Sequence, residues 1–145
     1  MKRTIIIKII SYLFIILFLY TAISKLLDYT VFKEQLAVSP ILKPIAPFLA
    51  WILPVTEALV SYILFVPRWR LRGLYAALIM MVLFTGYISA ILLFDDHLPC
   101  SCGGIIELLS WKQHLVLNII LIGAALTAVL LYRSVKQSYL SSYSI

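Results

Sequence analysis

Charged side chains are scarce in this sequence, and acidic ones are the scarcest. Only 12% of the 145 residues are charged, 63% are hydrophobic, and the mean hydropathy is +1.06. A water-soluble domain carries roughly 25% charged and 45–50% apolar residues, so the composition excludes a water-soluble fold. The length allows one domain, which we expect to occupy residues 1–145. It leaves no room for a separate soluble catalytic domain.

The net charge of +6 does not indicate a nucleic-acid-binding protein. The basic residues lie between apolar runs and form no continuous basic stripe. The partner that this composition predicts is a lipid bilayer, with no nucleic acid. Cysteine is rare as well: the two present are too few for a disulfide framework, but a single residue separates them.

Four long apolar segments predict membrane-spanning helices, each of which needs about 20 mostly apolar residues. The segments occupy about residues 5–24, 47–66, 71–94 and 111–132. The predicted fold class is therefore all-α, an integral membrane four-helix transmembrane bundle. The first segment also fits a secretory signal peptide that is cleaved. The polar tail from Ser134 to Ile145 is expected to fray.

The positions of lysine and arginine predict the orientation, because these residues favour the cytoplasmic side. One side of the bundle receives Lys2, Arg3, Lys8, Arg68, Arg70, Arg72, Arg133 and Lys136. This side is predicted to be cytoplasmic, with both termini on it, and the first and third loops face the opposite side. In the first loop we expect a short helix that Asp28 caps and Pro40 ends. Lys25, just before it, is expected to be an interfacial anchor.

The two cysteines, Cys100 and Cys102, lie in the third loop, just before a pair of glycines. A disulfide across one intervening residue must depart from relaxed geometry, and strain raises its reduction potential. This pattern favours thiol–disulfide chemistry in an oxidising compartment. Two alternatives stay open. In the first, the cysteine pair has a passive role, either as a static disulfide or as two free thiols. In the second, His97, Cys100 and Cys102 bind zinc or copper.

Polar side chains inside the predicted spans are the second candidate feature. Glu57 lies near the middle of the second span, where a carboxyl group is costly and normally faces the bundle interior with a partner. It is either a structural contact between helices, or a proton relay or quinone-headgroup contact. His114 and Asn118, four residues apart, share a face of the fourth span. They are interpreted as interhelical hydrogen-bonding residues, with a speculative quinone contact as the alternative.

The order of several short motifs resembles the methylamine-utilisation protein MauE family, within the DoxX-like group of small four-helix membrane proteins. The first span ends in Lys25-Leu26-Leu27-Asp28, and the second contains Pro54-Val55-Thr56-Glu57. Arginines follow, and Cys100-Ser101-Cys102-Gly103 then leads through Trp111 into the last span. The resemblance covers roughly residues 21–131. The sequence departs from the family's Cys-x-Cys-Phe-Gly pattern at Gly103, which stands where the phenylalanine would be.

The resemblance implies an accessory role in maturing a disulfide-rich periplasmic protein, which in the namesake system is the small subunit of methylamine dehydrogenase. We therefore expect a multi-pass protein of the bacterial inner membrane that acts on a periplasmic client or a thioredoxin-like partner. Cys100 and Cys102 are the expected exchanging pair, with Glu57 in the polar bundle interior. If the protein is an enzyme, it is expected to be like a thiol–disulfide oxidoreductase. The alternative is a non-enzymatic assembly factor or a metal-handling protein.

Overall fold

The computed structural model describes residues 2–40, 42–94 and 111–142. These residues form the helices α1 Lys2–Leu27, α2 Tyr29–Val38, η1 Lys43–Ile45, α3 Ala46–Phe65, α4 Arg70–Phe94 and α5 Trp111–Ser142. The described part of the chain contains no strand, which confirms the all-α fold class. Cys100, Cys102 and His97 lie outside the described residues.

Four of these helices, α1, α3, α4 and α5, are long and apolar enough to cross a membrane. They correspond to the four predicted spans, so the protein is a multi-pass membrane protein. Large apolar side chains such as Ile16, Leu83 and Phe48 are more than 60% exposed. The hydrocarbon of a bilayer covers such side chains as favourably as a protein core does.

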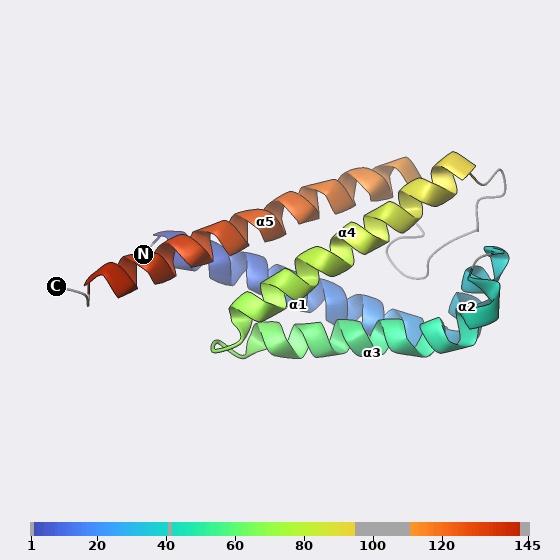
Figure 1. Cartoon of the computed structure of the whole chain (residues 1–145). Coiled ribbons are helices and arrows are strands. Elements are labelled where there is room, and N and C mark those ends of the chain that lie inside the picture. The colour runs from blue at the N-terminus through green and yellow to red at the C-terminus, as the bar shows by residue number, and fades with distance from the viewer. Residues whose placement is uncertain (1, 41, 95–110, 143–145) are drawn as a thin grey trace.

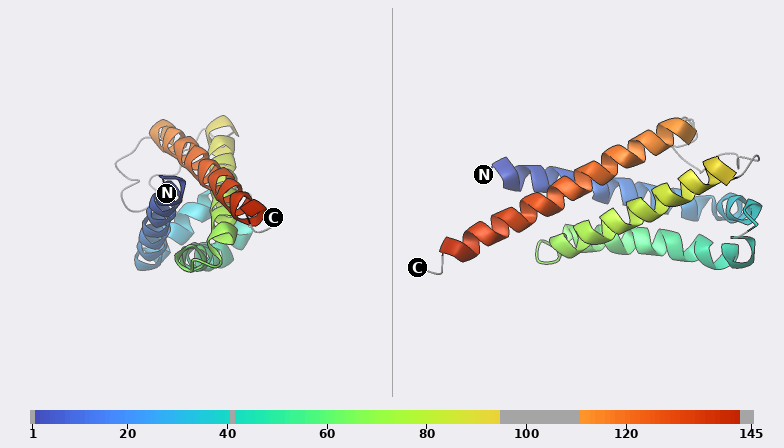
Figure 2. Two further views of the ribbon diagram at one scale, coloured as in Figure 1. Left: turned by 90° about the vertical axis from the view of Figure 1, so that its left-hand side faces the viewer. Right: turned by 45° about the horizontal axis from the view of Figure 1, so that its top comes forward.

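The four long helices form a ring in which each contacts two neighbours: α1 lies against α3 and α5, and α4 lies against the same two helices. Figures 1 and 2 show that both ends of the chain lie at one end of the helix bundle, and that α2 lies at the other end. Small residues allow close packing at the centre, where Ala77 of α4 and Ala125 and Ala128 of α5 are fully buried. The amphipathic α2 folds back on α3, with Phe32 and Leu36 packed against Ala46 and Ala50.

Three expectations need correction. The tail does not fray at Ser134, because α5 continues to Ser142. The chain after Gly123 contains no glycine or proline, and Arg3 donates a hydrogen bond of 2.8 Å to Ser134 Oγ. The short helix in the first loop is confirmed, but the Asp28 side chain makes no cap hydrogen bond; its backbone carbonyl accepts one from Phe32. Lys25 is not an interfacial anchor, since its side chain is only 10% exposed.

Candidate functional site

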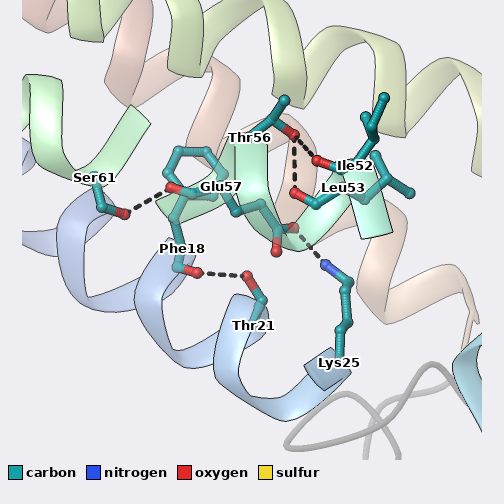
Figure 3. A network of polar contacts seen from close by, with 8 residues as sticks. All are labelled: Phe18, Thr21, Lys25, Ile52, Leu53, Thr56, Glu57 and Ser61. Atoms are coloured by element: carbon teal, nitrogen blue, oxygen red, sulfur yellow. Dashed lines mark hydrogen bonds and ion pairs between the residues drawn. The ribbon is translucent and has the colours of Figure 1, made fainter. Parts of the chain in front are cut away.

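The centre of the candidate site is an ion pair between Lys25 of α1 and Glu57 of α3 (Figure 3). Glu57 lies roughly 16 Å along α3 at ~1.5 Å per residue, about halfway through a hydrocarbon layer of ~30 Å. Lys25 is in the last turn of α1, and helical side chains tilt towards the N-terminus of their helix. The ammonium group therefore points back into the bundle and reaches the carboxylate.

Aromatic rings and helix backbone complete the surroundings of this pair. The ammonium of Lys25 lies 5.6 Å from the ring centroid of Phe32 and 5.4 Å from that of Phe84, distances at which a cation is attracted to a ring face. The Ser61 hydroxyl donates to the backbone carbonyl of Glu57 at 2.9 Å. The positive charge of Lys25 is thus stabilised by the carboxylate of Glu57 on α3 and by the rings of Phe32 on α2 and Phe84 on α4.

The structure confirms that Glu57 and the two polar residues of the last span face the bundle interior. Glu57 is 4% exposed, His114 is 5% exposed and Asn118 is 4% exposed. Glu57 lies on α3, and His114 and Asn118 lie on α5, so two helices contribute buried polar groups to the interior.

Three buried polar atoms of this cluster lack a hydrogen-bond partner within the described residues. They are Glu57 Oε2, His114 Nδ1 and Asn118 Nδ2. Leaving a buried polar group unpaired costs about 1–3 kcal/mol, and such groups in native proteins usually bind water, an ion or a ligand. A carboxylate oxygen, a ring nitrogen and an amide nitrogen offer both donor and acceptor capacity. This capacity suits a small polar headgroup.

An apolar groove of about 600 Å³ lies next to the ion pair, between α2, α3 and α4. Its lining includes Phe32 and Leu36 of α2, Leu53 and Val60 of α3, and Leu83 and Phe84 of α4. Phe32 and Phe84 are the same two rings that hold Lys25. The volume is within the range of about 300–1,000 Å³ that holds small ligands. These two rings therefore belong both to the lining of the groove and to the surroundings of the Lys25–Glu57 ion pair.

The sequence interpretation missed two parts of this site. The sequence predicts an interfacial position for Lys25, although an acid in a span usually needs a basic partner, and the long side chain of Lys25, in the last turn of α1, can reach back towards the middle of the bundle. The groove residues carry no sequence signal, because their side chains resemble those of any lipid-facing helix. No group of three metal-ligating side chains occurs in the described ranges.

The chain segment with both cysteines joins the end of α4 to the start of α5. These two helix ends lie at the same end of the bundle as α2 (Figure 1). The four other sequence motifs of the candidate family fall within the described residues, on helices or at their ends. In particular, the motifs that end in Asp28 and in Glu57 supply the two halves of the buried ion pair.

Of three comparisons with known proteins, one returned a match. Searches of curated proteins and of solved structures each returned no match. The family model described as "Methylamine utilisation protein MauE" matches residues 3–131, which is most of the chain and all four spans up to the extension of α5. This chain therefore belongs to the MauE family, which connects it with methylamine utilisation.

Proposed function

We propose that the protein is an accessory protein of the bacterial inner membrane that supports the maturation of an exported protein by thiol–disulfide exchange. Membership of the MauE family is the observation that carries this proposal. The buried Lys25–Glu57 cluster supports it, because an ionised pair deep in a bundle is a mark of a functional centre in a membrane protein. By analogy with the namesake system, the client is a disulfide-rich periplasmic protein such as the small subunit of methylamine dehydrogenase.

The orientation in this proposal follows from the basic residues at the end that carries both termini. Arg68, Arg70 and Arg72 lie there, in the link from α3 to α4 and the start of α4. Lysine and arginine favour the cytoplasmic side, so the opposite end faces the periplasm. Cys100 and Cys102 then belong to a periplasmic segment, where disulfides persist.

The exchange itself needs no group beyond the two thiols and a partner disulfide. One cysteine attacks a sulfur of the partner's disulfide as a thiolate, and one partner sulfur leaves as a thiolate. The second cysteine then attacks the resulting mixed disulfide. Cys100 and Cys102 become a disulfide, and the client or thioredoxin-like partner is released as a dithiol. The reverse sequence carries the electrons in the opposite direction.

The reverse sequence, which forms a disulfide in the client, leaves Cys100 and Cys102 as a dithiol, and a quinone is the acceptor that the site fits for re-oxidising it. Asn118 Nδ2 and, when protonated, His114 Nδ1 would donate to the carbonyl oxygens of a quinone headgroup, Glu57 Oε2 would accept from a hydroxyl of the quinol, and the groove beside Phe32 and Phe84 suits the isoprenoid chain. Oxidation of a dithiol releases two electrons and two protons, which a bound quinone would accept. Lys25 and Glu57 orient the headgroup and hold a proton near it.

The redox potential of the cysteine pair tests the exchange proposal. Protein purified in mild detergent is equilibrated in glutathione buffers, and free thiols are counted by the mass shift after alkylation. We expect a reversible couple well above the roughly −300 mV of structural disulfides. Cys100→Ser should leave Cys102 able to trap a mixed disulfide with the client. A pair that stays reduced throughout contradicts the proposal.

The same titration, repeated with zinc or copper(I), tests the alternative of a metal-handling protein. A metal site keeps both sulfurs as thiolates and releases protons on binding. In an exchange protein, His97→Ala should leave the potential and the mixed disulfide unchanged. Stoichiometric metal binding that His97→Ala abolishes would assign the cysteines to metal instead.

A matched pair of tryptophan substitutions on α4 tests the quinone groove. Leu83 is 68% exposed and lines the groove, whereas Val82 is 51% exposed and does not line it. Leu83→Trp should fill the groove and weaken the binding of a short-chain quinone, measured by quenching of the protein's fluorescence. Val82→Trp should leave binding unchanged. Equal binding by both variants would show that the groove does not hold the quinone.

A further inference from the structure

The opposite end of the bundle carries a second cleft, which the proposed redox function does not use. It has a volume of about 950 Å³ and lies between the start of α1, the α3–α4 link and the extension of α5. Its lining includes Arg68, Trp69, Arg72, Lys136, Tyr139 and Leu140. A basic hollow at the boundary of a membrane protein is a place where a charged lipid headgroup can bind.

No acidic side chain of the described residues neutralises the positive charge in this cleft. Within the described residues, the acidic side chains are Asp28 just before α2, Glu34 in α2 and Glu57 in the middle of α3, and none of them lines this cleft. Glu57 is already paired with Lys25. Arg68, Arg72 and Lys136 make no ion pair or hydrogen bond with another residue in the part of the chain that the structure describes. Their charges are available to an anion from outside.

A neighbouring hollow adds further basic groups to the same region. It has a volume of about 500 Å³ and is lined by Lys2 and Arg3 of α1 and by Val135, Ser138 and Tyr139 of α5. Val135 and Tyr139 line both hollows. The extension of α5 therefore runs between two basic sites, and Arg3 fixes it there through its hydrogen bond to Ser134.

The walls of the cleft favour a lipid over a soluble anion. Trp69 is 41% exposed, Tyr139 is 66% exposed and Leu140 is 63% exposed. Tryptophan and tyrosine prefer the headgroup level of a membrane, which places the cleft at the boundary between headgroups and hydrocarbon. A ligand there can put its phosphate against the arginines and its chains along the apolar side chains. A free phosphate would use only the first of these contacts.

We propose that this cleft is a binding site for an anionic glycerophospholipid. Arg68 of the link, Arg72 of α4 and Lys136 of α5 bind the phosphate. Tyr139 and Leu140 contact the glycerol region and the upper part of the acyl chains. The bound lipid offsets part of the positive charge at this end of the bundle and bridges α5 to the α3–α4 link. The proposal does not depend on the cysteines or on the redox function.

Native mass spectrometry of the full-length protein in mild detergent tests the site. Phosphatidylglycerol and phosphatidylcholine with the same oleoyl chains are titrated separately, and we expect a saturable complex with the first lipid only. Each basic residue near an anionic lipid strengthens binding roughly five-fold. The triple variant Arg68→Gln/Arg72→Gln/Lys136→Gln should therefore bind phosphatidylglycerol about 100-fold more weakly. The triple variant Lys33→Gln/Lys43→Gln/Lys112→Gln, with the same charge change at the other end, should bind it as the wild type does.

Three results would overturn the proposal. The first is equal binding of the two lipids by the wild-type protein, which needs no variant and so does not depend on the variant's folding. The second is an equal loss of binding in the two triple variants, which would show a diffuse charge effect. The third is full competition by glycerol 3-phosphate at the concentration of the lipid, which would assign the cleft to a soluble phosphate.

Discussion

Replacing Lys25 with methionine keeps most of the length of the side chain but removes the partner of Glu57. Glu57 is 4% exposed and lies near the middle of the bundle, so water cannot replace the lost ammonium group. Removing one partner of a buried ion pair destabilises a protein by about 3–5 kcal/mol. We expect Lys25→Met to lower the free energy of unfolding by about that amount.

Replacing Glu57 should destabilise the protein less than replacing Lys25, because the two members of the ion pair lie at different depths in the bundle. Lys25 is in the last turn of α1, so its long side chain can swing towards the headgroups when its partner is lost. Glu57 has no such route from the middle of α3. Glu57→Gln keeps a hydrogen-bond acceptor for the ammonium, and we expect a loss of about 1.5–3 kcal/mol, the usual range for a hydrogen bond to a charged group.

Unfolding of the purified variants by sodium dodecyl sulfate, followed by tryptophan fluorescence, measures these differences. Lys43→Met is the matched control, since Lys43 is an exposed lysine near the same end of the bundle. It should change the free energy of unfolding by less than about 0.5 kcal/mol. The double variant Lys25→Met/Glu57→Gln should recover much of the loss of Lys25→Met. If the two losses simply add, the side chains are not coupled and the ion pair has been misidentified.

Three further predictions concern other parts of the molecule. A methyl group on Gly73 would lie 2.9 Å from the backbone nitrogen and side chain of Leu64, so Gly73→Ala should destabilise the bundle by about 1–3 kcal/mol. Gly86 lies on the same helix with open space around it, so Gly86→Ala should stabilise the bundle by about 0.5–1 kcal/mol. Equal changes in stability for the two variants would refute the close approach of α3 and α4. Asn118→Leu removes a buried amide nitrogen without a partner within the described residues, so it should raise the free energy of unfolding by up to about 1–3 kcal/mol and weaken quinone binding. A loss of stability together with a loss of quinone binding would give Asn118 a structural role. After mild reduction, membrane-impermeant maleimide should label Cys100 and Cys102 in intact spheroplasts, and labelling only after lysis would reverse the proposed orientation.

The sequence by itself determined the four spans and the all-α class. A run of about 20 apolar residues has few options in a bilayer, because only a helix satisfies its own backbone hydrogen bonds there. It also determined that Glu57, His114 and Asn118 face the interior, since the lipid-facing side of a span is too costly for polar groups. The expected fraying after Ser134 is wrong, because a polar segment without glycine or proline can continue a helix. The residues after Arg133 form a regular helix that packs through Val135 and binds Arg3 through Ser134.

Only the tertiary structure decided which groups meet. Apart from a few polar residues the spans are apolar on every face, and lipid is as apolar as the bundle core, so hydrophobic periodicity does not show how α1 is placed against α3. That placement brings Lys25 to Glu57, 32 positions away in the chain. The groove behind Phe32 and Phe84 depends in the same way on how α2, α3 and α4 are spaced. The sequence supplied the charged and aromatic groups, and the packing of the helices joined them into one site, because side-chain contacts between spans depend on their relative register and rotation.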